Sequence, residues 1–428
     1  MSQINPTGWS EERVRKLVAE DSFSYQDIAL PYGLSTGGAD RSETARLVFE
    51  EDMRGKSVLD LGCRFGYFCF EALKRGAQRV VGVDVDPVAI QKARQLADIL
   101  GAKVEFKVLD IEKDRIDERF DYILGLNVLH HLKNPIGVLD DLMSLTRERL
   151  ILEVAALGAH DRRKLRLPPA ARYFLSRSPA IVVNTGRRSR RAGGQTFFIM
   201  PSALEHLVLH HRSTFSRLDV VKSTHKGRYL AIGHRRRMGH IVVVTGPTSA
   251  GKSTTCARLK RNEIPELAAR LEMGDGSRWT FVGAKGLGTL KEPVVENLLF
   301  HYDFLHTYMR NAQVPARDVL LDVLDTAERV TFLTIWTPPE VLLAQLRRGE
   351  LERHTKFGVY YGLKRNLRRR HLKLEQEYKN PARVVELYRN WFDYTRTRKA
   401  EHVVVSFAEG VRLFSVEEWE EEARAYER

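Results

Sequence analysis

The stretch Ser57-Val-Leu-Asp-Leu-Gly62 decides the fold of the first half of the chain, because it is an apolar run that ends in an acid and a glycine. The turn 62–66, Gly-Cys-Arg-Phe-Gly, leads into a helical stretch over 67–75, and the next apolar run, 80–84, ends in Asp84. A βαβ unit of this kind binds nucleosides, since its glycines let the backbone approach the ligand and the second strand's acid accepts hydrogen bonds from ribose hydroxyls. The sequence therefore predicts a nucleoside site here.

Three more apolar runs follow along the chain. They span 104–109, 120–126 and 149–154, and the first two are followed directly by a polar residue, Asp110 and Asn127 respectively. Five strand signals in this order predict a doubly wound, Rossmann-like α/β sheet, in which ligands bind outside the carboxyl ends of the strands.

This order of motifs resembles the class I S-adenosylmethionine-dependent methyltransferases over about residues 45–235. The residues that carry the resemblance are Val58-Leu59-Asp60-Leu61-Gly62-Cys63, Gly82-Val83-Asp84, Asp110, Phe120-Asp121 and Asn127-Val128-Leu129-His130-His131-Leu132. The run 127–135, with 150–153 after it, is similar to the branch that includes tRNA wobble-uridine carboxymethyltransferases and many small-molecule and sugar methyltransferases. The resemblance implies that S-adenosylmethionine is the cofactor.

The resemblance also implies which residues hold this cofactor. Asp60 and the glycine turn would face its methionine part, Asp84 would hold its ribose, and Asp110 with Ile111 would flank its adenine. The full set of expected cofactor residues is Asp60, Gly62, Cys63, Gly66, Asp84, Asp110, Ile111 and Asn127. The chain departs from the family at Arg64, which stands in place of the usual middle glycine and would either narrow the site or reach the cofactor's carboxylate.

Methyl transfer to a hydroxyl benefits from a group that accepts the departing proton, and neutral histidine suits this role at pH 7. His130 and His131 follow the fourth strand and are the candidate catalytic residues; alternatively, one caps a helix and the other packs. Glu153 is a second candidate base. The Gly-rich segment 21–45 is either a lid over the cofactor or an ordinary N-terminal loop.

The second half of the chain opens with the apolar strand 240–245, followed at once by Gly246-Pro-Thr-Ser-Ala-Gly-Lys252-Ser-Thr254 and a helical run. This is G-x-x-x-x-G-K-S in the strand–loop–helix context that a phosphate-binding loop requires. Lys252 is expected to reach the β and γ phosphates of ATP, and Ser253 to ligate Mg²⁺. The residues expected to bind ATP are Gly246, Ser249, Ala250, Gly251, Lys252, Ser253 and Thr254.

A second apolar run ends in Asp303, which is expected either to hold Mg²⁺ or to orient the acceptor hydroxyl, and which joins Lys252 as a candidate catalytic residue. Further strands are expected at 329–336 and 402–407, the last completing a parallel sheet. The order resembles small P-loop nucleoside and metabolite kinases over about residues 239–410. The resemblance implies an arginine-bearing lid, here residues 341–400, with the candidates Arg365, Arg368, Arg369 and Arg370.

The composition excludes global disorder, since 43% of the 428 residues are hydrophobic. The net charge of +14 indicates anionic partners, and it is concentrated. Residues 161–237 carry 18 Lys and Arg against 3 Asp and Glu, and residues 341–400 carry 16 against 6. The cluster 187–191 suits phosphate contact or is a solvated loop. Three cysteines fit a reducing cytoplasm, and we expect neither a signal peptide nor a transmembrane helix.

We therefore expect two doubly wound α/β domains. The first, 1–237, would be a methyltransferase with a core at 45–157, a basic insertion at 158–195 and a closing hairpin at 196–237; the second, 238–428, would be a P-loop kinase. Together they predict a cytoplasmic bifunctional enzyme that methylates and phosphorylates an anionic small hydroxyl compound, such as a sugar or bacterial glycan. The alternatives are an RNA-modifying methyltransferase with an ATP-using domain, and a methyltransferase gated by ATP binding.

Overall fold

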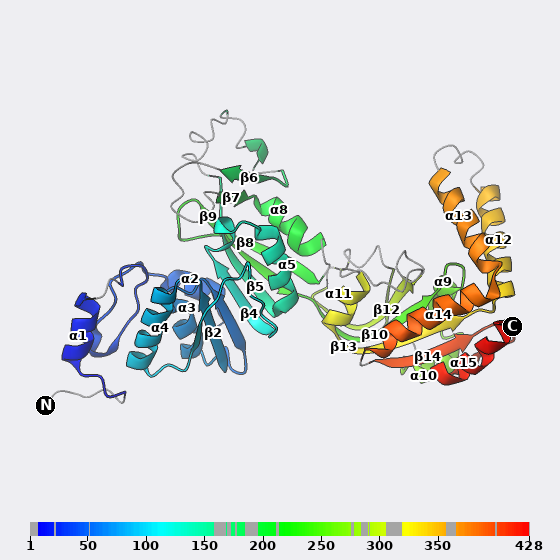
Figure 1. The fold of residues 1–428 in the computed structure, drawn as a ribbon, viewed down its shortest axis with the longest axis horizontal. Coiled ribbons are helices and arrows are strands. Elements are labelled where there is room, and N and C mark those ends of the chain that lie inside the picture. Colours follow the sequence, from blue (N-terminus) through cyan, green and yellow to red (C-terminus); the bar gives the residue numbers. More distant parts are fainter. Residues whose placement is uncertain are drawn as a thin grey trace. The chain divides into compact units, whose positions relative to one another are not determined.

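The computed structural model consists of two compact units, Met1–Arg235 and Arg236–Arg428, each with its own sheet (Figure 1). The residues that the structure describes are 7–20, 23–50, 52–157, 168, 173–175, 178–184, 196–210, 214–274, 278–283, 290, 292–304, 319–356, 365–398 and 400–427, without the side chains of 319, 321, 322 and 350–370.

The first unit is a Rossmann-like α/β fold around a seven-stranded mixed sheet of order β3-β2-β1-β4-β5-β9-β8. The first five strands are parallel, β9 runs antiparallel to β5, and β8 runs antiparallel to β9 and therefore in the same direction as the first five. Its elements are α1 (Glu11–Glu20), η1 (Pro31–Gly33), α2 (Ser42–Val48), β1 (Ser57–Leu61), α3 (Tyr67–Lys74), β2 (Arg79–Asp84), α4 (Pro87–Leu100), β3 (Glu105–Val108), β4 (Phe120–Leu126), η2 (Leu129–His131), α5 (Pro135–Leu145), β5 (Thr146–Ala155), β6 (Ile181–Asn184), β7 (Thr196–Ile199), α8 (Pro201–Glu205), η3 (His206–His210), β8 (Phe215–Lys222) and β9 (Arg228–Arg235).

Helices cover both faces of this sheet because alternate strand residues point to opposite sides. Val58 of β1 belongs to one buried cluster together with α2, α3 and α4, whereas the next residue, Leu59, belongs to a second cluster with α5 and α8. Strands that are buried on both faces read as continuous apolar runs, and this is why the sequence shows them so clearly.

The closing hairpin is shorter than the expected range 196–237, because only β8 and β9, residues 215–235, form it. Thr196–Ile199 instead pairs with β6 in a separate two-stranded sheet.

The boundary between the two units lies between two consecutive arginines. Arg235 donates to the backbone oxygens of Met143 and Thr146 in the first unit, whereas Arg236 donates to those of Leu290 and Glu292 in the second.

The second unit is an α/β fold around a six-stranded sheet of order β11-β12-β10-β13-β14-β15. Its elements are β10 (Arg237–Gly246), α9 (Lys252–Lys260), α10 (Pro265–Arg270), β11 (Thr280–Gly283), β12 (Val294–Asp303), α11 (Val319–Thr326), β13 (Ala327–Trp336), α12 (Pro339–Lys356), α13 (Arg365–Tyr378), α14 (Pro381–Arg396), β14 (Glu401–Ser406), β15 (Arg412–Phe414), α15 (Val416–Ala423) and η7 (Arg424–Tyr426). The expectation that residues 402–407 end an all-parallel sheet is wrong, since β15 follows and pairs antiparallel with β14.

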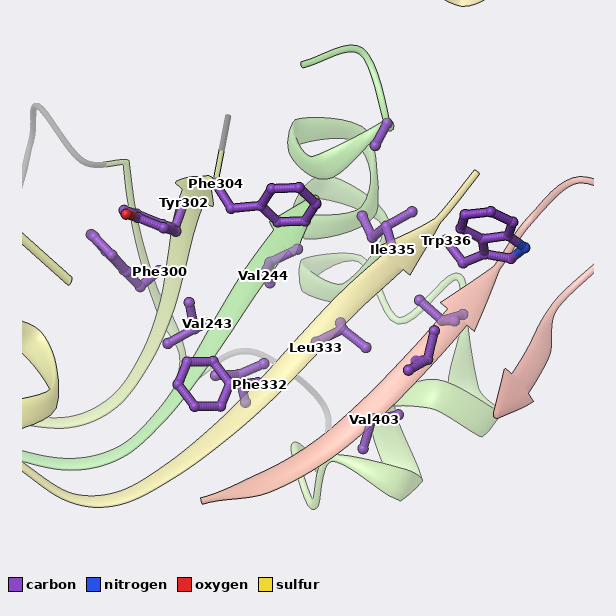
Figure 2. Packing of buried hydrophobic residues seen from close by; sticks show 14 of the residues in the cluster. Val243, Val244, Phe300, Tyr302, Phe304, Phe332, Leu333, Ile335, Trp336 and Val403 are labelled. Atoms are coloured by element: carbon purple, nitrogen blue, oxygen red, sulfur yellow. The ribbon is translucent and has the colours of Figure 1, made fainter. Parts of the chain in front are cut away.

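Aromatic side chains fix the carboxyl ends of β12 and β13 against α14. Trp391 of α14 stacks on Phe304, which directly follows Asp303, with ring centroids 5.4 Å apart. Tyr388, one helical turn earlier, donates its hydroxyl to the backbone oxygen of Ile335 at 2.7 Å. Figure 2 shows Phe304 beside the end of β12 and Ile335 with Trp336 at the end of β13. This packing holds Asp303 in a defined place.

Candidate functional site

The first candidate site lies where the strand order of the first unit reverses, between β1 and β4. In open α/β sheets this switch point is where ligands bind. The turn Gly62–Gly66 leaves β1 here, and three of its residues have left-handed backbone: Gly62 (φ 66°), Arg64 (φ 53°) and Gly66 (φ 87°). A Cβ atom on Gly66 would lie 2.6 Å from the Phe106 ring, so the tight turn needs glycine at that position.

Asp84 lies at the end of β2, and two backbone amides orient its carboxylate. The N–H of Arg64 donates to Oδ2 at 3.0 Å, and the N–H of Asp86 donates to Oδ1 at 2.9 Å. Asp86 also caps α4 by accepting from the N–H of Val88, which fixes the turn after β2. The next side chain, Val85, is 65% exposed, so an apolar surface adjoins an oriented carboxylate.

Asp60 is buried beneath the glycine turn, and the Cys69 thiol donates to its Oδ2 at 3.6 Å. Burial raises the pKa of Asp60 to about 7, because the charged carboxylate loses its water. The nearby charge of Asp84 raises this pKa further, whereas the Cys69 thiol lowers it. Burial also raises the pKa of Cys69 well above its ordinary value. Asp60 is therefore a buried acid that can change charge near neutral pH.

Asp110 and Ile111 follow β3, next to the end of β2. Leu109 donates its N–H to the backbone oxygen of Asp84 at 3.0 Å, which places the two strand ends side by side. Asp110 accepts from the Lys113 ammonium at 2.6 Å, and this contact lowers the pKa of Asp110. Ile111 is half-buried and packs against the cluster that contains β1 and β4.

Asn127 ends β4 with left-handed backbone (φ 65°), and its N–H donates to the backbone oxygen of Glu153 at 3.1 Å. Its side-chain Oδ1 is buried and has no hydrogen-bond partner within the part of the chain that the structure describes. Buried polar atoms normally have partners, so this acceptor and its unusual backbone make Asn127 a candidate ligand contact.

His130 and His131 lie in η2, one turn after Asn127, with ring centroids 4.1 Å apart. His130 is only 2% exposed, whereas His131 is half-exposed. Because η2 also contacts β7, the histidine pair lies between the end of β4 and the edge of the small β6–β7 sheet. Of the two, His131 is the more accessible to a ligand.

Glu153, the second candidate base, lies in a buried ion pair. Its carboxylate is fully buried, pairs with the Arg41 guanidinium at 3.0 Å and accepts from the Ser223 hydroxyl. Burial alone would raise the pKa of Glu153, but the Ser223 hydrogen bond and the Arg41 charge together lower it below its ordinary value. His225 also contacts Arg41, at 2.8 Å, and burial and this cation lower the pKa of His225.

Residues 23–41 of the N-terminal segment 21–45 contact both the glycine turn and the end of β5. At one end, Gln26 accepts from the N–H of Phe65 in the glycine turn at 3.1 Å, and the rings of Phe23 and Phe65 pack edge to face. At the other end, Arg41 makes the buried ion pair with Glu153. The segment therefore covers the glycine turn and reaches the end of β5.

The second candidate site is the loop between β10 and α9. The strand order of the second unit reverses at β10, since β12 lies on one side of it and β13 on the other. A Cβ atom on Gly246 would lie 3.1 Å from the Ala250 methyl and 3.2 Å from the Ile335 oxygen. Gly251 is left-handed (φ 87°) and precedes α9, whose first turn exposes Ser253 and Thr254. The loop thus ends at a helix N-terminus, a favourable place for phosphate.

Lys252 is buried within this loop, and burial lowers its pKa. Its ammonium donates to the backbone oxygens of Gly246 and Pro247, at 2.9 and 2.6 Å, and lies 3.4 Å from Asp303 Oδ2. Thr248 donates its hydroxyl to the same carboxylate oxygen at 2.8 Å. The structure therefore brings Lys252, Asp303 and the loop together, as the sequence predicts.

Tyr378 is a residue of this site that the sequence analysis missed. It ends α13, is 1% exposed, and donates its hydroxyl to the backbone oxygen of Thr248 at 2.9 Å. No local pattern could have identified it, because 130 positions separate the two residues. Ser223 and His225 of the first site could not be identified from local sequence for the same reason, since 70 and 184 positions separate them from Glu153 and Arg41.

The expected lid, 341–400, contains most of α12 together with all of α13 and α14. Arg347 of α12 pairs with Glu375 of α13 at 2.8 Å, so these two helices are tied to each other. The helix α13 carries four candidate lid residues whose side chains are outside the described part of the structure: Arg365, Arg368, Arg369 and Arg370. The whole cluster 187–191 is also outside the described part.

No helix among the described residues is both long and apolar enough to cross a membrane.

Known protein families resemble the part of the chain that contains the first site. A family model described as a methyltransferase domain matches residues 52–166. Residues 52–166 therefore form a methyltransferase domain. The match includes β1 to β5, the glycine turn, Asp84 and the histidine pair.

Curated relatives share this methyltransferase domain. A tRNA U34 carboxymethyltransferase from Campylobacter hominis is 34% identical over 94 residues, which are 22% of this chain and 33% of that protein. A ribosomal protein L11 methyltransferase from Alteromonas mediterranea is 43% identical over 106 residues, 24% of this chain and 36% of that protein. The chain thus spans about a third of the length of these relatives.

Among solved structures, the N-terminal domain of EvdMO1, determined in the presence of SAH and D-fucose, is 16% identical. Its TM-score is 0.43, and the match covers 54% of this chain and 100% of that one. Magnesium protoporphyrin IX methyltransferase from Synechocystis PCC 6803, with bound SAH, is 19% identical with a TM-score of 0.34, covering 45% and 80% of the two chains.

We predict that Arg41→Met destabilises the first unit, because it leaves the buried Glu153 carboxylate without its cation. Removing one partner of a buried ion pair typically costs about 3–5 kcal/mol. In the variant, burial raises the pKa of Glu153, so the carboxyl takes up a proton as the pH falls and the loss is smaller at pH 5 than at pH 8. Amide hydrogen exchange of β5 and β9 in the full chain measures this stability.

The matched control is the double variant Arg41→Met/Glu153→Gln, which removes both charges and should recover most of the lost protection. An equal loss at pH 5 and pH 8 in the single variant would show that Glu153 does not depend on Arg41 for its charge.

Proposed function

We propose that the methyltransferase domain transfers a methyl group from S-adenosylmethionine. The observation that carries this proposal is the pre-oriented Asp84 carboxylate beside the glycine turn, at the switch point of a sheet whose residues match a methyltransferase family. Bound S-adenosylmethionine supplies an electrophilic methyl group on a sulfonium, so the protein needs mainly to orient the reactants and accept a proton.

The residues present fit this cofactor. Asp84 has both carboxylate oxygens held by amides and suits two ribose hydroxyls, and the exposed Val85 suits one face of a purine. Asn127 offers a buried acceptor that has no partner in the described structure. Asp60 lies under the turn and, when ionised, stabilises a nearby cation such as the ammonium of the methionine part.

His131 is the better candidate of the histidine pair for accepting the proton. Its ring is half-exposed and packs against His130, which is buried. A neutral imidazole at the carboxyl end of β4 can hydrogen-bond an acceptor hydroxyl and take its proton as the methyl group moves. His130 then serves to hold the orientation of the His131 ring.

We predict that the affinity for S-adenosylmethionine rises as the pH increases from about 5.5 to 7.5. Asp60, whose pKa burial raises to about 7, must lose its proton to stabilise the cationic ligand. Release of one proton on binding gives up to about a tenfold gain in affinity per pH unit below that pKa. Equilibrium dialysis with labelled S-adenosylmethionine measures the effect.

Two variants distinguish the role of Asp60 from that of Asp84. Asp60→Asn should remove the pH dependence, whereas Asp84→Ala should weaken binding at least about tenfold at every pH and keep an upward slope. Absence of binding by the native protein would contradict the methyltransferase proposal, and a flat profile with intact binding would contradict only the role of Asp60.

We further propose that the second unit binds ATP with Mg²⁺ and transfers its γ-phosphate. The support is the complete G-x-x-x-x-G-K-S loop at the switch point, with Lys252 and Asp303 in contact. The Lys252 ammonium can exchange its hydrogen bonds to the backbone oxygens of Gly246 and Pro247 for hydrogen bonds to phosphate. The backbone amides at the start of α9 can bind the same negatively charged phosphates. Ser253 and Asp303 would hold Mg²⁺, which supplies further positive charge at the phosphates.

We predict that Lys252→Met weakens ATP binding at least about tenfold, since it removes the cation of the loop but keeps most of the side chain's length. Lys260→Met, at the exposed end of the same helix, is the matched control and should bind ATP normally. Isothermal titration of the full chain with MgATP measures both. Equal affinities in the two variants would contradict the assignment of Lys252.

For the acceptor, we propose a small hydroxyl compound such as a sugar or glycan. RNA is the second candidate, because the basic stretch 161–237 suits phosphates and relatives of the domain include tRNA carboxymethyltransferases. Gating of methyl transfer by ATP is a third possibility, which an Asp84→Ala variant tests: continued phosphorylation of an acceptor argues against pure gating.

We predict mass gains of ~14 Da and ~80 Da on one sugar compound when candidate pools are incubated with the protein, S-adenosylmethionine and MgATP. Mass spectrometry of sugar, nucleoside and RNA pools identifies the product. A gain of ~14 Da on RNA alone, with binding that weakens steeply as salt increases, would overturn the sugar proposal in favour of RNA.

A further inference from the structure

Arg64 is the most unusual residue of the glycine turn. Its backbone is left-handed (φ 53°), a conformation that glycine adopts readily and that costs a residue with a side chain conformational energy. Strain of this kind collects at functional sites, where the surrounding structure maintains it. The backbone amide of Arg64 alone would explain the turn, since it orients Asp84, but glycine would do that equally well. The side chain therefore needs its own explanation.

The guanidinium of Arg64 joins three parts of the site. It pairs with Asp86, in the turn after β2, at 2.7 Å. Its carbon atom also lies 5.6 Å from the centre of the Tyr25 ring and 5.4 Å from that of Phe65, distances at which a cation is attracted to aromatic rings. Tyr25 belongs to the N-terminal segment 23–41 and is itself 50% exposed.

The contacts of this segment differ in burial. The ion pair of Arg41 with Glu153 is almost fully buried, and the contact of Gln26 with Phe65 is buried as well. The contact of Tyr25 with Arg64, by contrast, lies at the surface, next to the Asp84 carboxylate whose orientation the same arginine maintains. The segment thus has a firm attachment at Arg41 and a weaker, accessible one at Tyr25.

We propose that Arg64 and Tyr25 form a clasp that retains the cofactor at the ribose end of its site. In this proposal, which rests on the proposed methyltransferase function, Arg64 is a positioning residue: it holds the Tyr25 end of the segment beside Asp84 and slows cofactor release. An exposed ion pair contributes little to stability. If Arg64 had a structural role only, removing its side chain would therefore leave the rate of cofactor release unchanged.

The test is the rate at which S-adenosylhomocysteine leaves the full-length protein, measured by stopped-flow displacement with excess S-adenosylmethionine. Arg64→Gly suits the left-handed backbone and keeps the amide that orients Asp84, so the fold should persist. We expect release to become at least about tenfold faster, with a smaller change in association. Tyr25→Ala should give a similar increase, and the double variant should add little to either, because both remove one interaction.

Arg79→Ala is the matched control, since Arg79 makes an exposed ion pair with Glu118 at the opposite end of β2 and should not affect release. Unchanged release rates in both Arg64→Gly and Tyr25→Ala would overturn the clasp and leave the methyltransferase proposal standing. Failure of the native protein to bind S-adenosylhomocysteine would overturn both. If Arg64→Gly does not fold, Tyr25→Ala alone decides between these outcomes.

Discussion

Both candidate sites depend on the same constraint, which is that parallel strands end together at one edge of a sheet. At this edge the strands stop pairing, so polar side chains and backbone amides become available to a ligand. In the first unit the edge collects Asp60, Asp84 and Asn127 from three neighbouring strands. In the second it places Gly246 directly opposite Asp303 in register. The chemistry of each site follows from which residues end which strands.

The central parts of both sites could be predicted from the sequence because their signals are local. A strand, a glycine turn and a helix lie within about twenty residues, and the backbone geometry of that unit fixes where its glycines and acid lie. Asp84 beside the turn and Lys252 beside the loop carbonyls are therefore found where the motifs place them. The fully buried strands could also be predicted, because each is a continuous apolar run in the sequence.

The remaining features could not be predicted because their partners are distant in the sequence. The ion pair of Arg41 and Glu153 spans 112 positions, so the sequence could not show that the carboxylate of this candidate base is buried and paired. The contact of Tyr378 with Thr248 spans 130 positions. Likewise, nothing in a short edge strand such as β15 distinguishes it from a loop, since three residues carry no periodic pattern.

We therefore propose two ligand sites, one for a methyl donor and one for a nucleoside triphosphate. The most direct test is a crystal structure of the full chain with S-adenosylhomocysteine and a non-hydrolysable ATP analogue with Mg²⁺. We predict that the first ligand lies with its ribose on Asp84 and its purine near Val85, and that the phosphates of the second lie along residues 246–254 with Lys252 turned toward them. Ligand density away from Asp84, or an ATP analogue bound elsewhere than this loop, would contradict it.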